Sequence, residues 1–119
     1  MVTSKLISPA WQIKAVINLE IANYIKHLTN QIFKALPMRQ DGVGIEFLMQ
    51  HMNSVYIDAM GFRMSNPILC EDKDFQTVLN IVAYLGSNQV DDVTWKREIF
   101  KATHALNDVE ARFGGDANG

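Results

Sequence analysis

The stretch PAWQIKAVINLEIANYIKHLTNQIFKAL, residues 9 to 36, decides the fold class. Its large apolar side chains recur at steps of three and four residues, at Ile13, Ile17, Ile21, Tyr24, Leu28, Ile32 and Leu36. That spacing places them on one face of an α-helix roughly 40 Å long. Ser8 and Pro9 are typical of a helix start, because the Ser oxygen accepts from an unpaired amide and Pro has no N–H to lose. Pro37 is expected to end the helix.

Further apolar residues widen this face of the first helix, namely Trp11, Val16, Leu19, Ile25 and Phe33. A helix with so wide an apolar surface is typically covered on several sides, as in the centre of a bundle or at a dimer contact. We therefore expect other helices, or a second chain, to pack around it.

A second helix is predicted from about residue 45, with apolar positions at Ile45, Leu48, Met52, Val55 and Ala59. Asp41 is its candidate N-cap, and Gly61 stands where a left-handed C-terminal residue is expected. Residues 62 to 70 form the longest expected irregular connection, in which Ser65-Asn66-Pro67 indicates a turn or a single-turn helix start.

The third predicted helix follows three acids that the positive end of a helix dipole favours, Glu71, Asp72 and Asp74. Its apolar positions are Phe75, Val78, Leu79, Val82 and Leu85. Gly86 is expected to close it. A strand is the alternative, because several residues are β-branched, although the period is closer to 3.6 than to 2. The acidic segment from Glu71 to Asp74 either caps this helix or recognises a basic partner.

Asp91 and Asp92 are candidate caps of a fourth helix, which Gly114-Gly115 ends. Its apolar positions are Trp95, Ile99, Ala102, Leu106, Val109 and Phe113. The prediction is an all-α fold: a four-helix bundle-like single domain over residues 1–113, antiparallel, with a long first helix and a flexible tail at 114–119. A chain of 119 residues with 48% hydrophobic residues suits one core.

The chain carries no sign of export or membrane insertion. No apolar run reaches the roughly 20 residues that a membrane-spanning helix needs, and the first residues lack the apolar segment of a secretory signal. Cys70 is the only cysteine, which excludes an internal disulfide and is typical of a reducing compartment. A cytoplasmic protein is predicted.

Enzyme chemistry finds little support in the sequence. The chain has three histidines, His27, His51 and His104, and no Glu stands three residues before any of them, as a di-metal bundle requires. Phosphate-binding and dinucleotide-binding glycine motifs are missing too, so no cofactor or metal is predicted. A small enzyme built on His27 or His104 is the third hypothesis.

Nucleic-acid binding is the second hypothesis. It would use Lys96, Arg97 and Lys101 on the fourth helix, with Trp95 as a stacking platform. Acidic residues share this helix, and residues 95 to 113 carry four basic residues against three acids, a net charge of +1. Phosphate binding depends on several clustered cations, so the signal is weak.

The leading hypothesis is a non-enzymatic protein-protein interaction module, acting as an adaptor, inhibitor or regulator and capable of forming a homodimer. Methionines and aromatic residues crowd the second helix and its flanks, and methionine recurs at recognition surfaces. The predicted contact residues are Met60, Phe62, Arg63 and Met64, because exposed aromatic, Met and Arg side chains anchor interfaces. The apolar surface of the first two helices exceeds what four short helices readily cover, which favours self-association.

Overall fold

The computed structural model describes residues 9 to 114, with side chains from residue 12 onward. The chain is all-α over this range, which confirms the predicted fold class. The elements in chain order are α2 (Pro9–Phe33), α3 (Ala35–Gln40), α4 (Ile45–Ser65), the 3-10 helix η1 (Pro67–Glu71), α5 (Lys73–Ser87) and α6 (Asp92–Gly114). Ser8 and the tail from residue 115 lie outside the described residues, and so does the side chain of Trp11.

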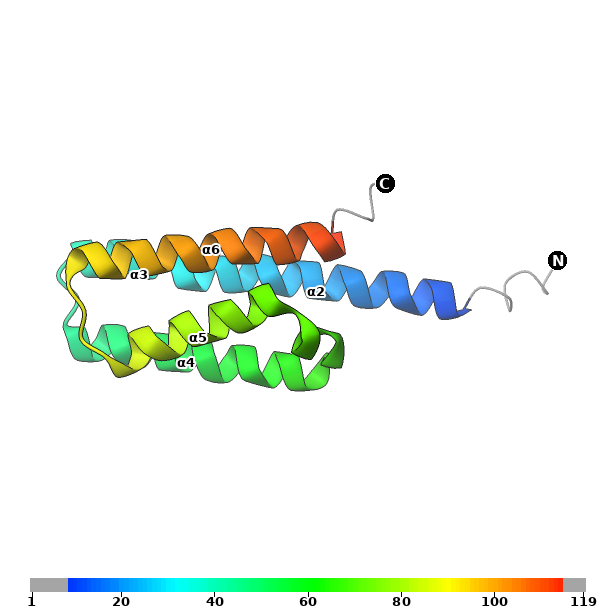
Figure 1. The fold of residues 1–119 in the computed structure, drawn as a ribbon, viewed down its shortest axis with the longest axis horizontal. Coiled ribbons are helices and arrows are strands. Elements are labelled where there is room, and N and C mark those ends of the chain that lie inside the picture. The colour runs from blue at the N-terminus through cyan, green and yellow to red at the C-terminus, as the bar shows by residue number, and fades with distance from the viewer. Residues whose placement is uncertain (1–8, 115–119) are drawn as a thin grey trace.

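The four long helices form an up-down antiparallel bundle of two layers (Figure 1). α2 and α6 lie side by side in one layer, and α4 and α5 form the other. α5 also packs closely on α6, whereas α2 and α4 contact each other only sparsely. The bundle is therefore closed on three sides and more open between α2 and α4.

The core is apolar, and helices of both layers contribute side chains to it. Its largest fully buried side chains include Trp95, Phe75, Ile21, Ile25, Leu28, Met52 and Leu85. Trp95 donates from Nε1 to the carbonyl oxygen of Ala35 at 3.2 Å, which satisfies the polar atom of its ring inside the core. This bond ties the start of α6 to α3.

The predicted end of the first helix at Leu36 is wrong by three residues. α2 ends at Phe33, and Pro37 lies within α3. Pro37 has no N–H to donate to the Phe33 carbonyl, and its ring crowds that oxygen, so the interruption falls one turn before the proline. Asp41 is not the N-cap of the next helix: it follows α3, and Gly44 precedes α4.

Two glycines do not end helices as predicted. α4 continues through Gly61 to Ser65. The side chain of Asn66 donates to the Phe62 carbonyl at 3.0 Å and ends the helix there. Gly86 is buried and is the next-to-last residue of α5, which ends at Ser87. A Cβ on Gly86 would collide with the side chain of Asn53, so this glycine permits the close approach of α4 and α5.

The acidic caps are where the sequence predicts them. Asp72 accepts from the Phe75 amide at 2.9 Å and begins α5, and Asp91 accepts from the Thr94 amide at 2.8 Å before α6. The predicted start of η1 at Pro67 is also observed. Arg112 pairs with Asp72 at 2.7 Å, so this acid caps a helix and joins it to α6.

Candidate functional site

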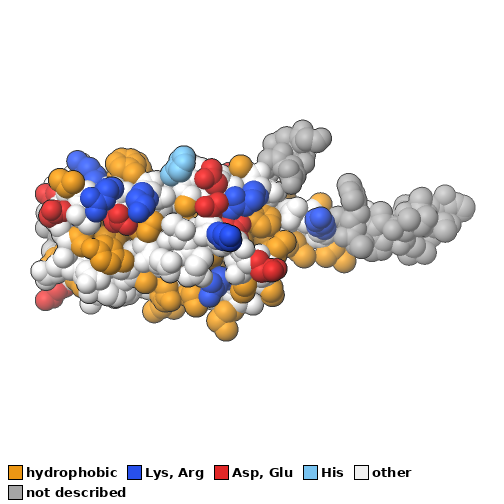
Figure 2. Space-filling model, in the orientation of Figure 1, with side chains coloured by type: hydrophobic (Ala, Val, Ile, Leu, Met, Phe, Trp, Pro, Cys, Tyr) orange, Lys and Arg blue, Asp and Glu red, His pale blue; other side chains and the backbone are white. Residues whose placement is uncertain are grey.

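The N-terminal part of α2 projects past the end of the bundle (Figure 1). We call residues 12 to 20 the overhang. Its large apolar side chains are 39% to 59% exposed, at Ile13, Val16, Ile17 and Leu19. Figure 2 shows hydrophobic side chains along this projecting part. Within one chain the other helices cover the first helix from Ile21 onward, where Ile21 is fully buried, but not the overhang.

An apolar groove lies between the overhang and the corner where α4 meets η1. It has a volume of about 560 Å³ and is lined by Ile13, Lys14, Ile17, Asn18, Ser65, Asn66, Pro67 and Ile68. Ile68 is half exposed, and Met64 is 76% exposed. Uncovered aliphatic side chains gathered around a hollow are typical of a protein-binding surface.

Of the four predicted contact residues, three make contacts within the chain and one is strongly exposed. The Phe62 ring stacks on Tyr24 with centroids 3.8 Å apart, and Met60 packs partly buried against the core. Arg63 donates to the Gln76 side chain at 2.6 Å. Only Met64 is strongly exposed. Sequence reasoning found the overhang's apolar stripe but had no signal that it lies beyond its neighbours.

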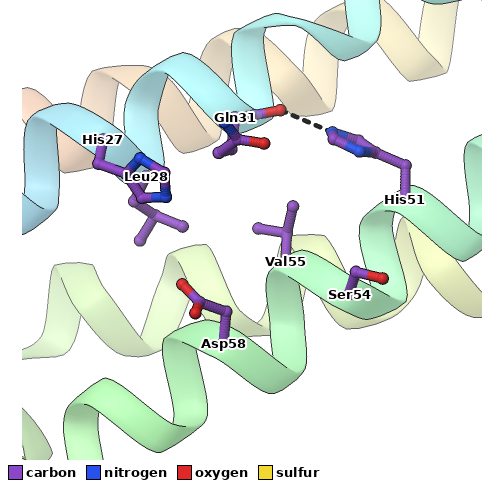
Figure 3. Close-up of a pocket in the computed structure, with 7 residues that line it drawn as sticks. All are labelled: His27, Leu28, Gln31, His51, Ser54, Val55 and Asp58. Atoms are coloured by element: carbon purple, nitrogen blue, oxygen red, sulfur yellow. Dashed lines mark hydrogen bonds between the residues drawn. The ribbon is translucent and has the colours of Figure 1, made fainter.

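A polar cleft occupies the open side of the bundle between α2 and α4 (Figure 3). It has a volume of about 320 Å³ and is lined by His27, Leu28, Gln31, His51, Ser54, Val55 and Asp58. His51 Nε2 lies 2.8 Å from the carbonyl oxygen of Gln31, which bridges the helices at one end. The Tyr24 hydroxyl donates to Asp58 Oδ2 at 2.6 Å and bridges them near the other.

The bond to Asp58 helps to keep the Tyr24 hydroxyl protonated. Burial raises the pKa of the Tyr24 hydroxyl, and the hydrogen bond to Asp58 and its negative charge raise it further. Tyr24 therefore remains a neutral donor, and Asp58 is the acceptor.

The residues of the nucleic-acid hypothesis are only partly at the surface. Trp95 is 1% exposed, and Arg39 lies over its ring at 5.2 Å, so Trp95 cannot stack on a base. Lys101 and Arg97 lie near Glu98, at 3.8 Å and 3.3 Å. Figure 2 shows acidic side chains among the basic ones where α6 begins. Lys96 is exposed.

The two histidines of the enzyme hypothesis lie in different places. His27 lines the polar cleft, whereas His104 is exposed on α6. Within residues 9 to 114, no three His, Cys, Asp or Glu side chains are grouped to hold a metal ion. Over the same range, no helix is both long enough and apolar enough to traverse a bilayer.

Comparison with family models, curated proteins and solved structures found no match to this chain.

Proposed function

We propose that this chain is a cytoplasmic, non-enzymatic interaction module, a regulator that acts by occupying surfaces and that pairs with a second copy of itself. The observation that carries the proposal is the overhang. Its exposed isoleucines, Ile13 and Ile17, continue the stripe that forms the core from Ile21 onward, and within one chain nothing described covers them. An apolar stripe of this kind is stabilised when a partner covers it.

We infer that the partner is a second copy of this chain. Each chain carries one projecting apolar helix and, beside it, one open apolar groove. A two-fold axis beside the overhang would place each projecting helix against the groove of the other copy. The same patch is then used twice, as in most homodimers.

The apolar surface around the groove is small. Three aliphatic side chains line it, Ile13, Ile17 and Ile68, and they are 59%, 39% and 51% exposed. Interfaces near the lower limit of specific contacts, about 1,000 Å² for the pair, are weak. We therefore expect a dimer of modest affinity.

The test is the native mass measured by light scattering after size exclusion over a range of concentrations. We expect twice the chain mass of 13.4 kDa at high concentration, decreasing on dilution. The double variant Ile13→Ser with Ile17→Ser should be monomeric throughout, with an unchanged circular dichroism spectrum. Ile57→Ser is the matched control, because Ile57 is 70% exposed on α4 outside the groove.

A wild-type chain that remains monomeric at the highest concentration would refute self-association. Mass that changes only when low-salt nucleic acid is added would favour the second hypothesis and Lys96, Arg97 and Lys101 instead. The burial of Trp95 and the acids near these cations argue against that outcome.

A further inference from the structure

We propose that the polar cleft between α2 and α4 binds a short linear alkyl diamine. The inference does not depend on self-association, because the cleft and the apolar groove share no lining residue. It follows from the charge, the acceptors and the length of the cleft.

Asp58 provides the negative charge. It is the only Asp or Glu lining the cleft, and no Lys or Arg lines it or forms an ion pair with Asp58 among the described residues. Oδ2 is occupied by the Tyr24 hydroxyl, and no described donor bonds to Oδ1. Figure 3 shows the carboxylate directed toward the α2 side of the cleft, where His27 lies. A carboxylate oxygen without a cationic partner is suited to an ammonium group.

The carboxylate is held in place before any ligand arrives. Tyr24 donates to it, and the Tyr24 ring is itself fixed by stacking on Phe62, with the ring planes 9° apart. A charged group that is already oriented loses little conformational entropy when it binds, which improves affinity for a small ligand.

The far end of the cleft presents the imidazole of His51. A backbone carbonyl can only accept, so the bond to Gln31 places a proton on His51 Nε2. Nδ1 is then the ring nitrogen left to accept a hydrogen bond. Between the two ends, Leu28 and Val55 provide an apolar floor. The cleft therefore has an anion, an apolar middle and a second acceptor.

The spacing selects the ligand length. Asp58 and His51 are seven residues apart on α4, a rise of about 10 Å. A ligand that bonds to both groups therefore needs a short chain of a few carbons between its two nitrogens. A volume of about 320 Å³ is also at the small end of ligand sites. A diamine satisfies both ends and places its methylene groups on Leu28 and Val55.

The experiment is a titration of the full chain with 1,3-diaminopropane at constant pH and ionic strength, followed by the imidazole proton signals in NMR. The signals of His27 and His51 should shift to saturation, while His104, exposed on α6, is the internal reference and should not shift. Asp58→Asn should weaken binding about tenfold or more, as expected for a lost charged hydrogen bond. Asp108→Asn on α6 is the matched control and should bind normally.

Two further ligands test the length and the second acceptor. Propylamine, with one nitrogen, should bind several-fold more weakly than 1,3-diaminopropane, and 1,2-diaminoethane should be too short to reach both ends. Shifts that never saturate, shifts of His104 equal to those of His51, or equal affinity in Asp58→Asn would each overturn the proposal. If propylamine bound as tightly as the diamine, the role of His51 would be wrong.

Discussion

The two halves of α2 have the same apolar pattern and opposite surroundings. Ile21 and Ile25 are completely buried, whereas Ile13 is 59% exposed on the same helix. The boundary lies where α6 ends: Gly114, its last residue, sits so close to Ala22 that an added Cβ would lie 3.1 Å from the Ala22 methyl group. Periodicity thus determines which face of a helix is apolar, and the lengths of its neighbours determine how much of that face is covered.

The largest expected effect on stability comes from replacing an isoleucine by alanine in each half of α2. Ile25→Ala should lower the free energy of unfolding by about 2–5 kcal/mol, because it leaves a cavity in a packed core. Ile13→Ala at a concentration where the chain is monomeric should change it by less than about 0.5 kcal/mol. Urea denaturation measures both. Equal effects of the two variants would mean that the overhang is covered within one chain.

Gly86 and Gly61 also differ in whether a neighbour covers them, and their replacement should have smaller effects on stability. Gly86→Ala should destabilise the chain by about 1–3 kcal/mol, because the new methyl group meets Asn53 at a packed helix contact. Gly61→Ala should stabilise it by about 0.5–1 kcal/mol, because nothing lies within 4 Å of the place that a Cβ would take and Ala is the better helix former. Thermal unfolding of both variants checks the signs. A neutral Gly86→Ala would show that Asn53 simply moves aside.

Tyr24 lies near the boundary between the halves, and its raised pKa makes stability depend on alkaline pH. The contribution is complete below the unfolded pKa of about 10 and is lost as the pH rises above it, because the unfolded chain ionises first. Tyr24→Phe should remove this dependence, making the decline of stability above pH 10 shallower by at most about 1.4 kcal/mol per pH unit. Denaturation between pH 8 and 11 measures the slopes. Parallel slopes would show that Tyr24 ionises normally in the folded chain.

The smallest expected effect concerns the cap of α6. Hydrogen bonds from Thr94 lower the pKa of Asp91, so its contribution is present above the unfolded pKa and is lost as the pH falls through the folded value. Asp91→Ala should be less stable than the wild type at neutral pH, and the difference should shrink below about pH 4. Thermal unfolding from pH 2 to pH 7 follows it. A constant difference over that range would exclude a role for the charge.

Much of the fold is predictable from local patterns. The four long helices follow from apolar residues at steps of three and four, and the caps at Asp72 and Asp91 follow from side chains that bond to amides three residues away. Pro37 predicts an interruption but not its position, because the ring acts on a carbonyl one turn earlier. Gly61 and Gly86 appear equivalent in sequence, and only packing distinguishes them.

The sequence by itself determined an all-α chain with four amphipathic helices, since these depend on residues within one or two turns of each other. Only the tertiary structure decided that half of the α2 stripe is uncovered, that Phe62 packs on Tyr24, and that Asp58 lies in a cleft with His51. Tyr24 and Asp58 are 34 residues apart, and His51 and Gln31 are 20 apart. Contacts over such separations depend on helix lengths and on which side of the bundle remains open, and no local pattern encodes either.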